Sequence, residues 1–362
     1  MCKNLGVMPE VQIEEVRRFM EESLIAVGAP ENEAKLQADL LLYADTVGHF
    51  SHGLNRLELY VNDIKGGLTC PERKPVVLKE SAATAWVDGM DALGATTATF
   101  CMDLAIKKAK ESGVGWVSAK RTNHFGMAGY WAIKAEREGL IGMAFTNSSP
   151  VMVPTRSKQS ACGTNPISMA APALDEDSLV VDMATTAAAM GKIEVQIHKN
   201  EPIPEGWALG PDGNTITDSQ LAFKTAKLLP LGGFEGTSGY KGFCLSAMVE
   251  MLCSGLSGSN PSYKVPAWTF DQDTAPNLGQ CFVAIDPECF APGFAERAAG
   301  CLQHWRNLQP VDPSSPVLAP GDKERNIREI TLRRGTIIYP QGQIDSYHLM
   351  AQKIGIKPLA VK

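Results

Sequence analysis

The sequence has no long hydrophobic segment, no excess of basic residues and no paired cysteines. No stretch approaches the roughly 18 consecutive apolar residues that a membrane helix needs. The 34 Lys and Arg against 40 Asp and Glu give a net charge of −6, which argues against nucleic acid as a partner. The nine cysteines form no CxxC pair, so neither a disulfide framework nor a metal site is expected. The first ten residues lack the features of a signal peptide, which favours a cytoplasmic protein.

Familiar site motifs are missing as well. The sequence contains no Walker A motif, no HExxH, no GxSxG and no GxGxxG after a strand, so the usual dinucleotide fingerprint is absent. What remains is an ordinary globular composition: 362 residues, 44% hydrophobic and 20% charged. This length predicts two domains or one enlarged domain. The 33 Gly and 23 Pro indicate many short elements joined by turns.

The hydrophobic pattern predicts an α/β fold that begins with helices. Apolar residues recur at three- and four-residue steps over 11–27, 32–45 and 54–64, which is typical of amphipathic helices. Beyond residue 75, short strands and helices alternate. We expect strands at 76–78, 84–87, 114–117, 140–145, 167–171, 179–183 and 282–285, and helices at 95–110, 128–136, 243–256 and 293–306. The Pro- and Gly-rich stretch 200–218 is expected to be a long loop.

The first candidate site is Ser51-His52-Gly53-Leu54-Asn55-Arg56, just before the third helix. Ser51 is expected to cap that helix, and His52 and Arg56, four residues apart, share a face. An imidazole beside a guanidinium suits a hydroxy acid, because Arg binds the carboxylate bidentately and His handles the hydroxyl proton. The simpler alternative is a capped helix with a surface arginine.

The second candidate site is the segment 121–129, which contains Asn123-His124-Phe125-Gly126 and opens a helix after a strand. The start of a helix presents backbone N–H groups to an anion such as a pyrophosphate, and Gly126 and Gly129 would allow its close approach. His124 would then stand beside the cofactor. Alternatively, His124 is a buried histidine tied to a backbone carbonyl at a turn.

Four further junctions carry Asn, Asp, Thr or Lys next to glycine or proline. They are Cys162-Gly163-Thr164-Asn165-Pro166, Asp182 to Thr186 followed by Met190-Gly191-Lys192, the glycine loop 232–242 with Lys241, and the turn 319–324. Ligand contacts in α/β folds gather at strand ends, and a Lys in a glycine loop suits a phosphate. The ordinary alternatives are an Asn-Pro turn, a helix cap at Asp182 and a surface turn.

Together the motifs SHGxxR, NHFGxAG, GTNP, DMAT, GYKG and PGD, in this order along nearly the whole chain, resemble the type 2 malate/L-lactate dehydrogenase family, also called the malate/L-sulfolactate/ureidoglycolate dehydrogenase family. The resemblance implies an NAD- or NADP-dependent oxidoreductase with a non-Rossmann nicotinamide-binding fold and an N-terminal helical unit. It also implies a homodimer with sites near the subunit interface.

The resemblance implies a role for each matching residue. His124 would accept the proton, Ser51 and His52 would form a relay pair, and Arg56 and Thr164 would touch the substrate. The residues that would contact the cofactor are His124, Phe125, Gly126, Met127, Ala128, Asp182, Met183, Ala184, Lys241, Pro320, Gly321 and Asp322. The chain departs from the family at Met190, where many members have Arg, and at Lys192, where imine-reducing members have an acidic residue.

The same resemblance predicts how the chain is organised. Residues 1–75 would form the helical unit with the SHGxxR site, and 76–120 an α/β segment packing with the C-terminal part. Residues 121–310 would form the central cofactor-binding domain, and 311–362 would return to the first domain.

The predicted reaction is reversible hydride transfer between nicotinamide and C2 of a small 2-hydroxy acid of the malate, lactate or sulfolactate type. Two alternatives remain: reduction of cyclic 2-imino acids on the same fold, and a non-catalytic ligand-binding or structural protein. The sequence does not decide between NAD and NADP.

Overall fold

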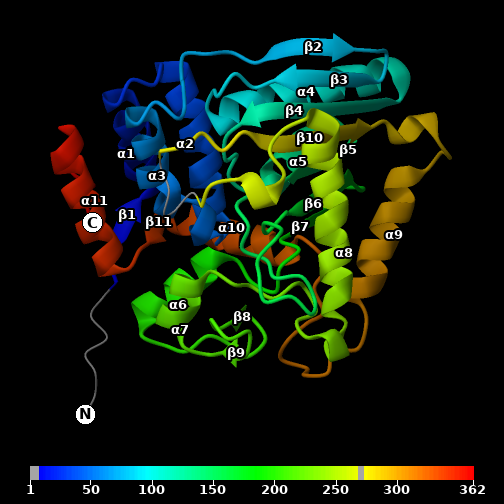
Figure 1. The fold of residues 1–362 in the computed structure, drawn as a ribbon. Helices are drawn as coiled ribbons and strands as arrows, with labels where there is room; N and C mark the ends of the chain where they lie inside the picture. The colour runs from blue at the N-terminus through cyan, green and yellow to red at the C-terminus, as the bar shows by residue number, and fades with distance from the viewer. Residues whose placement is uncertain (1–7, 268–272) are drawn as a thin grey trace.

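The computed structural model describes residues 8–267 and 273–362, and its centre is a seven-stranded mixed sheet (Figure 1). The strand order is β2-β3-β4-β10-β5-β6-β7, in which β3 and β4 pair in parallel and every other neighbouring pair is antiparallel. The strands are β2 (Val76–Glu80), β3 (Thr84–Asp88), β4 (Val114–Thr122), β5 (Ile141–Thr146), β6 (Ile167–Pro172), β7 (Ser178–Met183) and β10 (Leu278–Ile285). The expected α/β class is confirmed.

Two separate cores cover the two faces of the sheet. Because side chains alternate along a strand, Phe282 and Ala284 of β10 belong to one core and Cys281 and Val283 to the other. Helices α4 (Gly94–Ser112) and α5 (Ala128–Glu136) pack on the first face. On the second lies α8 (Gly239–Glu250), which continues as a π-helical turn over Met251–Gly255. The helix expected over 243–256 therefore changes its geometry after Glu250.

Helices from both ends of the chain form another core (Figure 1). Its elements are α1 (Ile13–Ala26), α2 (Glu31–Thr46), α3 (Leu57–Lys65) and α11 (Gln341–Ile354). Strand β1 (Glu10–Gln12) pairs with β11 (Thr336–Ile338), which joins the two ends directly. This core includes Phe19 and Tyr347, whose rings pack edge to face at 5.9 Å. The apolar residues that recur in 11–27 and 54–64 thus face a shared interior, as an amphipathic helix requires.

The remaining elements surround the lower part of the sheet in Figure 1. A small unit contains α6 (Met190–Lys199), α7 (Ser219–Thr225) and the two-residue strands β8 (Ala208–Leu209) and β9 (Thr215–Ile216), with its own apolar core. The stretch 200–218, expected to be a plain loop, therefore contains a short strand pair. Helices α9 (Phe294–Arg306) and α10 (Asp322–Arg334) and the 3₁₀ turns Glu235–Thr237, Ser262–Lys264 and Pro287–Cys289 complete the described chain.

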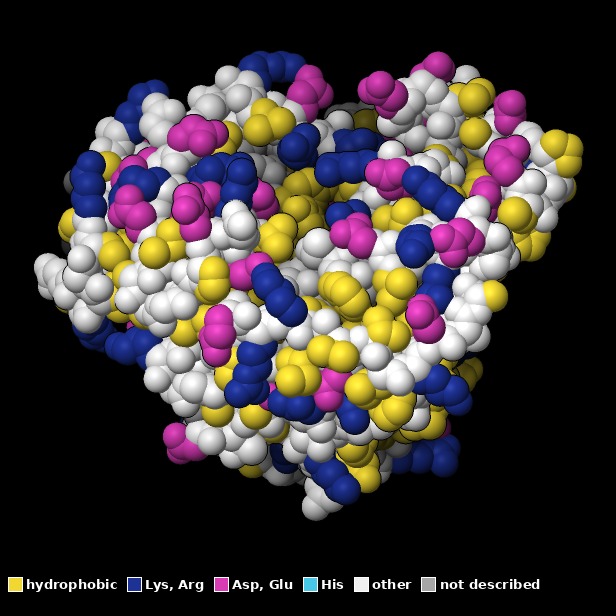
Figure 2. Space-filling view, turned by 90° about the horizontal axis from the view of Figure 1, so that it is seen from above, with side chains coloured by type: hydrophobic (Ala, Val, Ile, Leu, Met, Phe, Trp, Pro, Cys, Tyr) yellow, Lys and Arg dark blue, Asp and Glu magenta, His cyan; other side chains and the backbone are white. Residues whose placement is uncertain are grey.

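The surface seen in Figure 2 mixes Lys and Arg side chains with Asp and Glu, and hydrophobic side chains lie among them. This face therefore carries no extended area of a single charge sign. Within the described ranges, no helix is long and apolar enough to cross a membrane.

Candidate functional site

A buried aspartate holds the SHGxxR segment in place. Asp45 of α2 accepts hydrogen bonds from the Leu54 N–H at 2.9 Å and from the Tyr339 hydroxyl at 2.7 Å. Burial raises the pKa of Asp45 to about 7. A Cβ at Gly53 would overlap the Asp45 carboxylate, so the backbone can approach Asp45 this closely only with glycine at that position.

The expected helix cap at Ser51 is wrong. Two 3₁₀ turns, Phe50–His52 and Leu54–Arg56, precede α3, which begins at Leu57 without a side-chain cap. The Ser51 hydroxyl instead shares a hydrogen bond of 2.9 Å with Nδ1 of His52. Because Ser51 fixes the orientation of an imidazole, the segment is more than a capped helix with a surface arginine.

His52 and His124 lie together although 71 other residues separate them in the sequence. Their rings stack with centroids 5.9 Å apart and planes 21° apart, and both side chains are half-buried. Burial and the nearby Arg56 charge lower the pKa of His52 to about 3, and burial, His52 and Arg56 lower the pKa of His124 well below its ordinary value. Both imidazoles are therefore neutral at pH 7, the state in which a ring nitrogen can accept a proton.

Tyr60 of α3 holds the second imidazole, although the apolar pattern over 54–64 predicts only that it lies on the buried face of a helix. Its hydroxyl lies 2.5 Å from Nδ1 of His124, and the Gly126 N–H donates to the same nitrogen at 3.2 Å. With the ring hydrogen on Nε2, Nδ1 accepts from both groups. With the hydrogen on Nδ1, that nitrogen donates to Tyr60, it no longer accepts from the Gly126 N–H, and Nε2 can accept a proton. The only sequence signal for Tyr60 is its position four residues after Arg56, one helical turn away.

Arg56 is fixed on one side of its guanidinium. Its Nε donates to the Ser51 carbonyl at 2.7 Å, and one terminal nitrogen, Nη2, donates to Glu194 of α6 at 2.9 Å. Glu194 also accepts from the Asn55 side chain at 2.9 Å. The start of α6 packs closely here, because a Cβ at Gly191 would overlap Ser51 and lie 3.0 Å from Nη2 of Arg56.

The start of α5 is occupied by the protein's own groups. Asp182, at the end of β7, accepts a hydrogen bond from the Gly129 N–H, and burial raises the pKa of Asp182 to about 6. A Cβ at Gly129 would lie 2.6 Å from the Asp182 carboxylate, and one at Gly126 would lie 2.6 Å from Leu40. The close approach that these glycines permit is thus made by Asp182 and Leu40, and the Gly126 and Gly129 N–H groups at this helix start have partners within the protein.

The GTNP and DMAT segments contact each other directly. The backbone N–H and the hydroxyl of Thr185 both donate to the Thr164 carbonyl at 2.9 Å. Asn165 is buried and donates to the carboxylate of Glu250 at 2.9 Å. Glu250 therefore anchors the segment that carries Thr164, a function that neighbouring sequence did not indicate.

The PGD turn lies against β7. The Val180 N–H donates to the Pro320 carbonyl at 3.2 Å, and a Cβ at Gly321 would lie 3.0 Å from Val180. The Asp322 carboxylate is held by Arg306 and Arg325 and by the Ala319 N–H, and Arg306 in particular keeps the pKa of Asp322 well below its ordinary value. The Asp322 carboxylate thus closes a turn.

The other predicted cofactor residues differ in their accessibility. The side chains of Phe125, Met127 and Ala128 are buried, so they leave only backbone atoms for a ligand, whereas Met183 is exposed and Ala184 half-buried. Lys241, in the first turn of α8, is exposed and makes no side-chain hydrogen bond or ion pair to any described residue. The structure therefore brings SHGxxR, NHFGxAG, GTNP and DMAT into one connected set of contacts. PGD reaches this set through Val180, and GYKG reaches it through Leu231, which Gly242 packs against and whose N–H donates to the Thr185 carbonyl.

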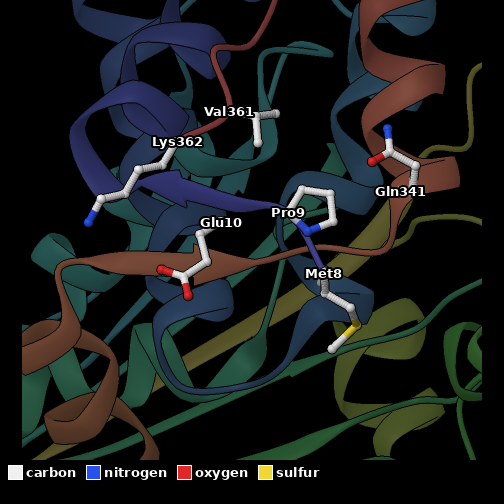
Figure 3. A pocket seen from close by; sticks show the side chains of 6 residues that line it. All are labelled: Met8, Pro9, Glu10, Gln341, Val361 and Lys362. Atoms are coloured by element: carbon white, nitrogen blue, oxygen red, sulfur yellow. The ribbon is translucent and has the colours of Figure 1, made fainter. Parts of the chain in front are cut away.

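Two surface cavities lie away from this set of contacts. The one in Figure 3, about 440 Å³, is lined by Met8, Pro9, Glu10, Gln341, Val361 and Lys362, near the two ends of the described chain. The other, about 610 Å³, is lined by Arg17, Glu21, Glu31, Asn32, Lys35 and Asp39. Neither contains a predicted site residue. Over the part of the chain that the structure describes, no three His, Cys, Asp or Glu side chains gather as metal ligands would.

Comparison with known proteins gives a consistent family. The family model described as malate/L-lactate dehydrogenase matches residues 11–346. Malate dehydrogenase of Pyrococcus horikoshii is 38% identical over 344 residues, covering 94% of each chain. Its solved structure superimposes with a TM-score of 0.88 and 34% identity, covering 98% of this chain and 99% of that one.

Two further relatives act on other acids. L-sulfolactate dehydrogenase of Methanocaldococcus jannaschii is 36% identical over 316 residues, covering 86% of this chain and 89% of that protein. The structure of delta1-piperideine-2-carboxylate reductase from Pseudomonas syringae pvar. tomato has a TM-score of 0.83 and 25% identity, covering 96% of this chain and all of that one.

Proposed function

The chain belongs to the malate/L-lactate dehydrogenase family, and we propose that Ser51, His52, Arg56 and His124 form its active site. The chain is an NAD- or NADP-dependent oxidoreductase that transfers a hydride between nicotinamide and a small 2-hydroxy acid of the malate, lactate or sulfolactate type. The observation that carries the site assignment is the stacked pair of neutral imidazoles, 5.9 Å apart, beside the Arg56 guanidinium.

His124 serves as the proton acceptor when the hydroxy acid is oxidised. In the tautomer with the ring hydrogen on Nδ1, Nε2 takes the hydroxyl proton, while Nδ1–H donates to the Tyr60 hydroxyl, which keeps the ring oriented. His52 and Ser51, joined by their 2.9 Å hydrogen bond, form the relay through which the proton leaves. Bound NAD or NADP supplies the hydride acceptor at C4 of its nicotinamide.

Arg56 binds the substrate carboxylate, and Thr164 contacts the substrate with its hydroxyl. A guanidinium offers two parallel N–H donors that match a carboxylate. Arg56 carries an unused nitrogen, Nη1, since its described hydrogen bonds come from Nε and Nη2 only. Thr164 is half-buried, and Ser148 and Thr185 hold its backbone, so its position is fixed before substrate arrives.

The residues present fit a nicotinamide cofactor. Met183 offers an exposed apolar side chain at the end of β7, two residues before Thr185. The residue before it, Asp182, accepts from the Gly129 N–H at the start of α5. We assign cofactor contact to His124, to backbone atoms of 125–128, and to Asp182, Met183 and Ala184. The turn Pro320-Gly321-Asp322 completes this face through its backbone, because its carboxylate is already held in ion pairs.

The proposed cofactor fold is not of the Rossmann type, and the N-terminal helices form a unit of their own. A Rossmann sheet is parallel, whereas here only β3 and β4 pair in parallel among the seven strands of the central sheet. The helices α1, α2 and α3 share a core with α11, and Leu40 of α2 also packs into the core on one face of the sheet. We assign residues 1–75 to the helical unit, 76–120 and 121–310 to the sheet, and 311–362 to the returning segment, in a cytoplasmic protein.

Replacing Arg56 with Lys is expected to raise KM for the hydroxy acid about tenfold or more and to leave KM for the cofactor unchanged. Lys keeps the positive charge but loses the planar two-point contact with a carboxylate. Steady-state kinetics with each substrate varied separately measures both constants. If the Lys variant keeps the wild-type KM for the acid, Arg56 does not bind the substrate.

The proposed function is tested by cofactor titration followed by a substrate scan. Quenching of protein fluorescence by NADH and NADPH identifies the cofactor, and absorbance at the nicotinamide band is then followed with malate, lactate, sulfolactate and a cyclic 2-imino acid. We expect turnover with one of the hydroxy acids. Turnover of the cyclic imine alone would instead place the chain with the piperideine-carboxylate reductase that shares its fold.

The protein is expected to be a homodimer in solution. Tyr240, Met248 and Met251 are 46%, 46% and 61% exposed and follow one another on the outer face of α8 and its π-helical turn. A second copy covering this face would bury it and would bring Lys241, which the single chain leaves unused, into an interface.

Light scattering at micromolar concentration measures the mass of the wild type and of the variant Met248→Glu. The wild type should have the mass of two chains, and the variant should dissociate. Leu349→Glu is the matched control, because Leu349 is 58% exposed on α11. A fully active wild-type monomer would show that no dimer is needed.

A further inference from the structure

One edge of the Arg56 guanidinium is fully used by the protein. Nε–H and one Nη2–H point along the same side of the planar group, and they are taken by the Ser51 carbonyl at 2.7 Å and by Glu194 at 2.9 Å. Two donors held on one edge fix both the position and the plane of the guanidinium. The remaining edge, with Nη1, is then the part of the group that can meet a carboxylate.

We propose that Glu194 is a positioning residue that holds Arg56 in the orientation needed to bind the substrate carboxylate. This inference rests on the proposed function, because it assumes that Arg56 binds a carboxylic acid. Glu194 acts through Arg56 and touches neither the substrate nor the reacting atoms.

Three features separate this ion pair from an ordinary surface pair. The side chains of Arg56 and Glu194 are only 11% and 16% exposed, and exposed pairs are the ones that contribute little. Glu194 is itself held, because Asn55 donates to the same carboxylate oxygen at 2.9 Å. One oxygen therefore receives two donors from adjacent residues of the SHGxxR segment.

The backbone of α6 contributes the third feature. Gly191, three residues before Glu194, packs against Ser51 so closely that a Cβ there would overlap the serine. This contact places the start of helix α6 beside the SHGxxR segment. Glu194 lies one helical turn after Gly191, on the same side of the helix, where it contacts the Arg56 guanidinium. The small unit of α6, α7, β8 and β9 is thus connected to the substrate site through Glu194.

Loss of Glu194 should affect the affinity for the acid and leave the affinity for the cofactor unchanged. Without its partner, the Arg56 side chain samples other rotamers, and substrate must order it on binding at a cost in affinity. Glu194→Ala is expected to raise KM for the hydroxy acid about tenfold. Glu194→Gln keeps one oxygen that can accept from both Arg56 and Asn55, and is expected to stay within about threefold of wild type.

The experiment combines kinetics with a binding measurement that needs no turnover. KM for acid and cofactor and kcat are measured for wild type, Glu194→Ala and Glu194→Gln, with Glu201→Ala as control, because Glu201 is exposed just beyond α6. In parallel, oxamate, an unreactive analogue of a 2-oxo acid, is titrated in the presence of NADH or NADPH, and the shift in unfolding temperature is followed. The Ala variant should need about ten times more oxamate for the same shift.

The outcomes separate the inference from the proposed function. If the wild type binds oxamate and turns over a hydroxy acid, but Glu194→Ala has the same KM, the positioning role is wrong. Equal rises in KM for acid and cofactor, with a lower unfolding temperature than the Glu201→Ala control, would show a merely structural residue and overturn it too. If the wild type neither binds oxamate nor oxidises a hydroxy acid, the proposed function itself fails.

Discussion

Replacing His124 with Ala is expected to lower kcat for oxidation of the hydroxy acid by about 10²- to 10⁴-fold, the usual contribution of general acid–base catalysis. The hydride cannot leave C2 while the hydroxyl proton has no acceptor. Tyr60 and Gly126 both contact Nδ1 of His124, and we assign the proton to the other ring nitrogen, Nε2. The effect should fall mainly on kcat. Because His124 is also assigned a cofactor contact, fluorescence titration measures the change in cofactor affinity separately.

The His124→Ala variant should remain folded. His124 is half-buried, and its removal costs the Tyr60 and Gly126 contacts without opening an apolar core. His304→Ala is the matched control, because His304 is exposed on α9 and lies outside the proposed site. If His124→Ala kept the wild-type kcat and His52→Ala lost it, His52 would be the proton acceptor and the two roles would be exchanged.

The sequence predicted the residues proposed to act on the substrate better than it predicted the side chains that hold those residues in position. His52, Arg56 and His124 were identified because each stands in a short motif next to glycine. Tyr60 and Glu194 were missed because their contacts join residues far apart in the chain: Tyr60 and His124 differ by 64 in residue number, and Arg56 and Glu194 differ by 138. No local spacing reports such pairs, since only the packing of α3 and α6 brings them together.

The same holds for the helices and strands: those with a clear local pattern in the sequence were predicted, and those without one were not. Helices with an apolar stripe, such as α1 and α3, were found because their buried residues repeat at helical spacing. Helix α10 was not predicted, because Asp322 and Thr331 are its buried residues and charged side chains dominate its sequence. Strands β8 and β9, two residues each, are too short for any alternation of side chains to appear.

Replacing Glu250 with Ala is expected to lower the free energy of unfolding by about 3 to 5 kcal/mol, because several buried donors would lose their shared acceptor. The Glu250 carboxylate accepts hydrogen bonds from the side chains of Asn147, Asn165, Ser254 and Ser262 and from the Ser262 N–H, at 2.5 to 3.2 Å. Each donor left unpaired in a water-poor interior costs about 1 to 3 kcal/mol.

Loss of the Glu250 carboxylate should also affect the active site. Asn165 follows Thr164 directly, so its release from Glu250 loosens the segment that presents Thr164 to substrate, and KM for the hydroxy acid should rise in the folded fraction.

Glu250→Gln is expected to be less stable than wild type as well, because its amide N–H group adds a donor where only donors point. Urea unfolding followed by circular dichroism compares these variants with Glu296→Ala, an exposed carboxylate on α9 that should change stability by about 0.5 kcal/mol or less. An Ala variant that unfolds at the same urea concentration as wild type would mean that water replaces the carboxylate at every donor, and that Glu250 does not anchor the segment.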